Sequence, residues 1–520
     1  MIRAMPGSCL ENRSLVCCLI LSLALIAVHS LAEDDLSPLL QRRWFEGRTA
    51  HFNVYSCGET QQVSRLVARL EQFRQAYSVL AGAQAVASPP IVVLAFPDVD
   101  TMRPFRPVRE GKPANLTAFF HHGIDENLIV LPLTDSFSLQ AILHEYTHLL
   151  LRHNDPFWPL WLKEGMAEIY SNIEVTGART VRIGRPLSEH LRLLAEQPLL
   201  PLHDLFAVTH DSPEYNERER QGIFYAESWL LAHFLMVGDH AAHRAAFSQL
   251  TALLRQGQSP EQAFTNAFRA TPARIENELQ RYARGKFENP VDFPLAIDLT
   301  APQSLLTRPL APVEVCCRLG DELLQINRPE AAESYFRRAE KMAPGSPLPY
   351  EGLGLLAAEQ DHVDEAIRLL SQAMKRGPVS FLAHHVYAAQ KFRLASGSAD
   401  LYRPVRGETA REIRSELQKS LSLMPDFAGS HHLIGIFELV QQEDATSAEK
   451  HLQRAIQLEP ENLSYLLSLA QAQLLKEDVP AARRTLDLLR RPYVNSQLRA
   501  HAEELLQEID RQAEQPHSRR

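Results

Sequence analysis

The stretch Ala332–Pro344 reads AESYFRRAEKMAP, and the spacing of its two alanines and its proline recurs along the second half of the chain. Residues 366–378 (AIRLLSQAMKRGP) and 448–460 (AEKHLQRAIQLEP) keep the same offsets, the first of them 34 residues later. Small residues mark places where helices approach closely, and a proline ends a helix. The pattern therefore predicts a series of helix pairs that stack on one another.

This pattern resembles the tetratricopeptide repeat (TPR), a helix-turn-helix unit of 34 residues. Pro425 and Ala482 continue it, so that about five units cover residues 312–495, with a loop insertion near 396–408 and a capping helix after 496. The resemblance implies an all-α TPR solenoid over residues 312–512, followed by a polar tail at 513–520. It also implies a protein partner on the concave face, the alternative being a stabilising appendage without a ligand of its own.

Composition narrows the class of protein. The chain has 520 residues, of which 45% are hydrophobic and 22% charged, and its formal net charge is −9. This is ordinary globular composition, which excludes a disordered or disulfide-dense chain. The acidic balance and the absence of a Lys/Arg-rich stripe predict that no nucleic acid is bound.

Residues 1–32 are typical of a secretory signal peptide. Arg3 and Arg13 precede or flank an apolar run from Leu15 to Val28, and Ser30-Leu31-Ala32 offers a small-residue cleavage site. The sequence therefore predicts a secreted or periplasmic protein, with an uncleaved membrane anchor as the alternative. After removal of this segment, no run is apolar enough to span a membrane. Three cysteines then remain, and this odd number predicts buried thiols rather than a disulfide framework.

The chemistry is predicted in the first half, where residues 139–150 read LQAILHEYTHLL. Leu139, Leu143 and Leu150 recur at helical spacing, so the segment is expected to be a helix. His144 and His148 are then one turn apart on one face, where their imidazoles can bind one zinc ion. Glu145 lies beside them, where a general base for a zinc-bound water is needed.

A second stretch supplies two carboxylates. Residues 158–168 read WPLWLKEGMAE, and Pro159 suits the first turn of a second helix. Glu164 and Glu168 are again one turn apart. A catalytic zinc site needs three protein ligands and an open position, and Glu164 can supply the third ligand. Glu168 can hydrogen-bond the far nitrogen of a ligand histidine.

This combination resembles the gluzincin metallopeptidases, in particular the peptidase MA-like domain, whose second helix is similar to 159–168 here. The resemblance covers roughly residues 44–290. It implies one zinc ion per chain held by His144, His148 and Glu164, with Glu145 as the catalytic base and a peptide or protein as the substrate. His153, which lacks the spacing of a metzincin ligand, and Asp155 are weaker alternatives for the third ligand.

A tetrahedral intermediate needs a further donor for its developing negative charge. Tyr225, in the helical stretch 223–233, matches a tyrosine of the related domain and is the candidate; a structural role is the alternative. His233, on the same stretch, is expected to be a hydrogen-bonded structural histidine, and Glu227 to be structural.

The fold expected for residues 33–290 is an α+β zincin-like catalytic domain, with a small mixed sheet and active-site helices. Its strands are expected near 50–56, 90–96, 117–120, 128–131 and 181–183, and a long amphipathic helix over 61–80. Five prolines from Phe287 to Pro312, counting Pro312 itself, predict an inter-domain linker at 291–311.

Taken together, the sequence predicts a zinc metallopeptidase, a hydrolase acting on peptide bonds, that carries a TPR interaction domain. A non-catalytic TPR scaffold with a zincin-like structural domain is one alternative. Zinc-dependent hydrolysis of a non-peptide substrate is another.

Overall fold

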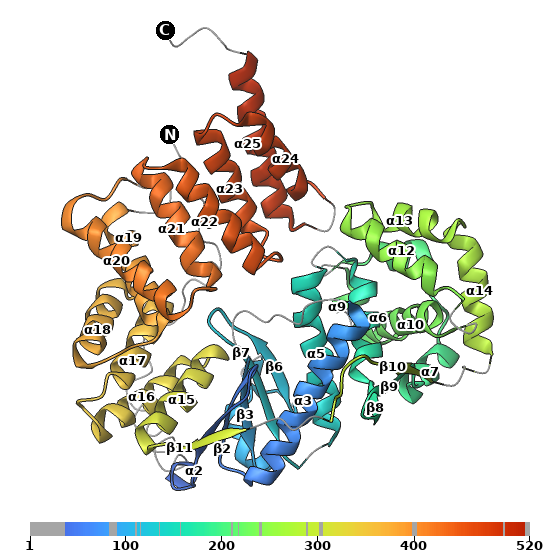
Figure 1. Ribbon diagram of the computed structural model, residues 1–520, viewed down its shortest axis with the longest axis horizontal. Helices are drawn as coiled ribbons and strands as arrows, with labels where there is room; N and C mark the ends of the chain where they lie inside the picture. The colour runs from blue at the N-terminus through green and yellow to red at the C-terminus, as the bar shows by residue number, and fades with distance from the viewer. Residues whose placement is uncertain are drawn as a thin grey trace, which may run out of the picture.

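The structure is a computed structural model (Figure 1). It describes residues 37–82, 91–109, 112–114, 116–134, 136–155, 158–209, 212–216, 218–238, 242–285, 287, 290–300, 305–397, 403–491 and 494–514. The predicted signal peptide at 1–32 and most of the predicted polar tail lie outside these residues.

A mixed six-stranded sheet organises the first half. Its strand order is β11 (Leu306–Pro309), β1 (Phe45–Arg48), β2 (Phe52–Ser56), β3 (Ile91–Phe96), β7 (Asn127–Pro132) and β6 (Phe119–His122). Strands β2, β3 and β7 are parallel, whereas β6 pairs antiparallel with β7 and forms one edge. The strands predicted near 50–56, 90–96, 117–120 and 128–131 are therefore confirmed, with small shifts of their ends.

Both faces of this sheet are buried. In β3, Ile91, Val93 and Ala95 belong to one apolar core, while the alternate residues belong to a second core on the opposite face. A strand buried on both faces needs a continuous apolar run rather than an alternating one, and IVVLAF is such a run.

The first core lies between the sheet and the helices of the first half. It contains α3 (Thr60–Ala81), α5 (Ser136–Asn154), α6 (Leu160–Ser171) and α10 (Arg218–Met236). The remaining helices and the two smaller sheets complete this half: α2 (Ser37–Leu40), α4 (Val99–Met102), α7 (Ser188–Glu196), α8 (Leu202–Ala207), α9 (Pro213–Asn216), α12 (Arg244–Arg255), α13 (Pro260–Phe268), α14 (Pro272–Arg284), the 3-10 helix η1 (Arg103–Phe105), the pair β4 (Val108–Arg109) and β5 (Lys112–Pro113), and the strands β8 (Glu174–Gly177) and β9 (Thr180–Ile183).

The second half is a series of antiparallel helix pairs. They are α15 (Pro312–Gln325) with α16 (Pro329–Met342), α17 (Leu348–Glu359) with α18 (Val363–Arg376), α19 (Phe381–Ser396) with α20 (Gly407–Leu423), α21 (Ala428–Gln441) with α22 (Ala445–Leu458), and α23 (Ser464–Leu475) with α24 (Val479–Leu489), followed by α25 (Ser496–Glu514). The five predicted repeats and the capping helix are confirmed. The insertion predicted near 396–408 falls between α19 and α20, and its residues 398–402 lie outside the described residues.

The small residues of the repeat pattern lie where the helices touch. Ala332, Ala339, Ala366 and Ala373 are all fully buried. A Cβ atom added at Gly352 would lie 2.3 Å from the ring of Phe336, on the preceding repeat. The spacing in the sequence therefore reflects close approach between helices.

The segment 291–311 does more than link the two halves. Its strand β10 (Val291–Pro294) pairs antiparallel with β9, and its strand β11 pairs antiparallel with β1. Both are edge strands, and their prolines, Pro294 and Pro309, are the last strand residues, where a missing N–H is tolerated. The proline content alone did not reveal this pairing.

The repeats begin on the second face of the sheet. Val92, Leu94 and Phe96 of β3 share one core with α15, α16, α17 and α18. Polar contacts add to this junction: Arg318 Nη1 donates to Glu126 Oε2 at 2.9 Å, and Gln325 Nε2 donates to Asp125 Oδ1 at 2.6 Å. The first two repeats and the sheet therefore form one packed body.

From this junction the repeats follow an arc that returns towards α12 and α13 (Figure 1). A Cβ atom added at Gly257, in the turn between those helices, would lie 2.3 Å from the guanidinium of Arg491 after α24. Among the described residues, no helix combines the length and the apolar character that crossing a membrane requires.

One close helix contact fixes α6 against α10. A Cβ atom added at Gly165 would lie 2.3 Å from the backbone oxygen of Ser228 and 2.9 Å from Cβ of Ala232. The Gly165→Ala variant is expected to lose about 1–3 kcal/mol of unfolding free energy, because backbone rather than a flexible side chain opposes the new methyl group. Chemical denaturation followed by circular dichroism measures this.

The matched control is Gly222→Ala on α10, where the added Cβ would lie 3.4 Å from the flexible Leu193 side chain. Since glycine costs about 0.5–1 kcal/mol in a helix interior, this variant should be neutral or stabilising. Equal stability of the two variants would contradict the close-contact interpretation.

Candidate metal centre

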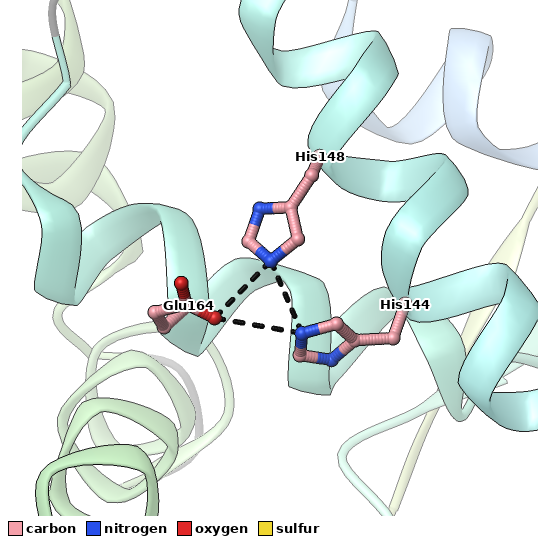
Figure 2. Close-up of side chains that lie close together, drawn as sticks. All are labelled: His144, His148 and Glu164. Carbon is pink, nitrogen blue, oxygen red and sulfur yellow. Dashed lines mark hydrogen bonds and ion pairs between the residues drawn. The ribbon is translucent and has the colours of Figure 1, made fainter. Parts of the chain in front are cut away.

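Two helices bring together the HExxH motif, which is His144–His148, and the stretch 158–168 with its two glutamates. Helix α5 carries His144, Glu145 and His148, and α6 carries Glu164 and Glu168. Apolar residues of both helices, among them Leu143, Leu150 and Trp161, lie in the first core and fix the pair against the sheet. The histidines and Glu164 extend from facing surfaces of the two helices (Figure 2).

The three side chains converge on one point. His148 Nε2 lies 3.1 Å from His144 Nε2 and 3.1 Å from Glu164 Oε2, and His144 Nε2 lies 3.4 Å from the same carboxylate oxygen. Among the described residues, this is the group of His, Cys, Asp and Glu side chains that is compact enough to hold a metal ion.

These distances fit a tetrahedral zinc site. Ligand atoms at about 2.0–2.1 Å from a zinc ion lie about 3.3 Å from one another. Two imidazoles and one carboxylate are also a donor set that zinc accepts, with the fourth position left for water. The arrangement can therefore hold zinc.

The carboxylate is ionised at neutral pH. Glu164 is 2% exposed, and burial alone would raise its pKa. Hydrogen bonds from His144 and His148 outweigh burial and lower the pKa of Glu164 to about 2. A buried anion beside two imidazoles is the electrostatic environment that favours a bound cation.

Glu168 lies behind the triad. Its Oε1 is 3.6 Å from Nδ1 of His144, the nitrogen that faces away from Glu164, and 3.4 Å from Nε2 of His190 on α7. This contact can orient the ring of His144, the role that the sequence predicts for Glu168. His190 was not predicted, because only the fold brings α7 beside α6.

Two tyrosines border the same site. Tyr215 on α9 and Tyr225 on α10 have ring centroids 6.2 Å apart and are hydrogen-bonded to each other. Burial raises the pKa of Tyr215, and the negative charges of Glu164 and Glu145 raise it further. Tyr215 therefore lies near the exposed Glu145 and the triad, and Tyr225 lies beside Tyr215. Sequence reasoning missed Tyr215, which has no motif around it.

The weaker candidates lie elsewhere. His153 is not part of the compact group, and Asp155 instead accepts two hydrogen bonds from Arg255, at 2.6 and 3.1 Å. His233 is fully buried, with Nε2 2.9 Å from the Gly184 oxygen and Nδ1 2.7 Å from the Tyr282 hydroxyl. Both ring nitrogens have partners, so the structural role predicted for His233 is confirmed.

The remaining cysteines are free in the structure. Cys316 and Cys317 are buried in the second core, and Cys57 packs partly buried against it. The prediction of buried thiols that act as small apolar residues is confirmed for Cys316 and Cys317, whereas Cys57 is only partly buried.

Comparisons with known proteins concern the second half of the chain. Two protein-family models described as tetratricopeptide repeat match residues 317–384 and 439–503. The second half is therefore a TPR domain, as its helix pairs also indicate. No curated protein matches the chain.

Several solved structures are similar to part of this chain. YrrB, titled a TPR protein with an unusual peptide-binding site, is 15% identical with a TM-score of 0.29, covering 36% of this chain and 90% of its own. A thermophilic TPR protein from Thermus thermophilus, TTC0263, is 20% identical with a TM-score of 0.29, covering 37% and 98%. Pseudomonas aeruginosa pilF is 16% identical with a TM-score of 0.30, covering 39% and 87%.

If the triad binds zinc, purified protein should contain one zinc ion per chain, and Glu164→Ala should lose most of it. The Glu168→Gln variant keeps all three ligands and is expected to bind zinc about 10–100-fold more weakly. Mass spectrometry of metal content and competition with a chromophoric chelator measure both effects. Full zinc retention by Glu164→Ala would contradict the three-ligand site.

A second expectation concerns Glu227, which is fully buried on α10 and accepts a hydrogen bond from the Leu200 N–H at 2.7 Å. Burial raises the pKa of Glu227 from 4.5 to about 8. Because the folded pKa lies above the unfolded one, the stability from this group is complete below pH 4.5 and is lost as the pH rises towards 8.

The Glu227→Gln variant should therefore unfold at a higher temperature than the wild type at pH 8, and at a similar or lower temperature at pH 4.5. Thermal denaturation across this range measures the difference, with the exposed Glu261→Gln on α13 as the control. Parallel pH profiles of Glu227→Gln and wild type would contradict the expectation.

Proposed function

We propose that this protein is a zinc metallopeptidase whose TPR domain binds a protein partner or substrate. The observation that carries the proposal is the convergence of His144, His148 and Glu164, with ligand atoms 3.1–3.4 Å apart. A bound zinc ion would supply a Lewis acid and lower the pKa of a coordinated water.

The protein's own residues have distinct roles in this proposal. Glu145, exposed beside the triad, accepts the proton of the attacking water and returns it to the leaving amine. Glu168 holds the ring of His144 in position. The Tyr225 hydroxyl, with Tyr215 beside it, donates a hydrogen bond to the oxyanion of the tetrahedral intermediate.

The position of the edge strand β6 favours a polypeptide as the substrate. It lies at the end of the sheet order and packs next to α5, which carries the histidines. An extended peptide can pair with a sheet edge through its backbone, which suits a peptidase that accepts varied side chains. We also propose that residues 1–32 direct the chain to the periplasm or the outside of the cell.

A non-catalytic TPR scaffold is the second candidate, and the comparisons support it more directly. Both family matches fall in the repeats, and stacked repeats of this kind form extended concave binding surfaces. In that case the triad would be a structural site, and the biological work would lie with the partner of the repeats.

The experiment that separates the two candidates is hydrolysis of a quenched peptide library and of denatured casein by the zinc-loaded protein. Glu145→Gln should lower kcat by about 10²–10⁴-fold, because it removes the general base but no ligand. Tyr225→Phe should lower kcat by about 10²–10³-fold if Tyr225 stabilises the oxyanion.

Zinc content is the control, and it should be unchanged in both variants. A zinc-loaded wild type that cleaves neither substrate, and that behaves like Glu145→Gln, would favour the scaffold over the peptidase.

A further inference from the structure

One buried histidine beside the metal centre has no part in the chemistry described so far. The side chain of His190 on α7 is 14% exposed. Both of its ring nitrogens are shielded from solvent, and neither has a hydrogen-bond partner among the described residues. Buried polar atoms without such partners are uncommon in folded proteins. The imidazole therefore either fills space or acts on a charge close to it.

The charge that His190 faces is the carboxylate of Glu168 on α6. Glu168 Oε1 lies 3.4 Å from Nε2 of His190 and 3.6 Å from Nδ1 of His144. Both distances are in the range of ion pairs and are longer than a well-formed hydrogen bond. Within the described part of the chain, no other side chain forms an ion pair or a hydrogen bond with this carboxylate. One oxygen atom is therefore shared by two imidazole rings.

The chemistry of the triad assigns the protons of these rings. Nε2 of His144 faces His148 and Glu164, so it is the nitrogen available to a metal ion. The proton of a neutral His144 is then on Nδ1, which can donate to Glu168. His190 can direct a second N–H at the same oxygen through its Nε2. Glu168 thus has two donors, one on a ligand and one on a third helix.

Packing on α10 fixes the ring of His190. Its centroid lies 5.7 Å from that of Trp229, which is fully buried in the first core. Helix α10 packs against both α6 and α7, and Gly165 allows the close approach of α6. The distance between Glu168 and His190 is therefore set by one rigid helix that contacts both of their elements.

A second donor restricts the conformations that the carboxylate can adopt. Glu168 is 16% exposed, and with a single donor its side chain can turn towards solvent, where water satisfies its oxygens. The N–H of His190 instead favours the conformation that faces His144. Outer partners of this kind fix the ring of a ligand histidine and increase the affinity of the site for its metal.

We propose that His190 is a positioning residue of the metal centre, which holds the Glu168 carboxylate against Nδ1 of His144 and thereby strengthens zinc binding. The inference rests on the zinc site of the proposed function and not on peptidase activity. The other role open to His190 is to fill space beside Trp229. That role depends on the size of the side chain and not on its N–H group, so substitutions separate the two.

His190→Leu keeps an apolar side chain beside Trp229 and removes the donor. Its zinc dissociation constant is expected to rise about 3–10-fold, less than the roughly 10–100-fold effect of losing a direct partner of a ligand. His190→Gln keeps an N–H donor near the position of Nε2 and should bind zinc within about twofold of wild type. Competition with a chromophoric chelator at neutral pH measures the three constants.

A double-mutant cycle with Glu168→Ala tests whether His190 acts through Glu168. In the Glu168→Ala background, His190→Leu should have no further effect on the zinc dissociation constant, because the carboxylate that joins the two rings is absent. The exposed His203→Leu on α8 is the matched control and should leave zinc binding unchanged. Thermal unfolding of the metal-free variants checks their folding, and His190→Met replaces the leucine variant if that variant is unstable.

Unchanged zinc binding in His190→Leu would overturn the inference. An equal loss in His190→Gln would overturn it too, since packing and not the donor would then matter, and so would independent effects in the cycle. If zinc binds but no peptide is hydrolysed, the peptidase proposal fails and the zinc constants still decide the role of His190. If the wild type binds no zinc, the metal centre and this role are both excluded.

Discussion

Burial of both faces of one sheet is the constraint on which the rest of the structure depends. Strand β3 directs alternate side chains into two different cores, one shared with the helices of the candidate metal centre and one shared with the first repeats. A solenoid attached by a flexible linker would have no fixed relation to a site in another domain. Here the same six residues support both halves, so the direction of the repeats is fixed where they begin.

The candidate metal centre depends indirectly on this core, because the core positions the two helices that carry the ligands. Helices α5 and α6 carry the ligands on their facing sides and apolar residues on the opposite sides, which pack in the first core. Gly165 lets α6 approach α10 closely and so sets the position of its neighbour Glu164. The distances of 3.1–3.4 Å between ligand atoms are therefore a result of helix packing as much as of the motif.

The first two repeats share an apolar core with the sheet, whereas the later repeats pack on one another. Each later repeat packs mainly on its neighbours in small separate clusters, as expected for a solenoid whose stability is a sum of local contacts. Bending can therefore accumulate along the arc without breaking any single core.

What the sequence by itself determined is local. The 34-residue spacing of small residues and prolines predicted the repeats, the HExxH spacing placed His144 and His148 on one helix face, and the apolar run of β3 indicated a buried strand. Only the tertiary structure decided which distant elements meet: β10 and β11 in the proline-rich segment with their partner strands, His190 and Tyr215 with the site, and α15 with the sheet. No local pattern encodes such pairings. They follow from the burial of apolar surface over the whole chain, which brings together side chains whose own neighbours in sequence carry no signal.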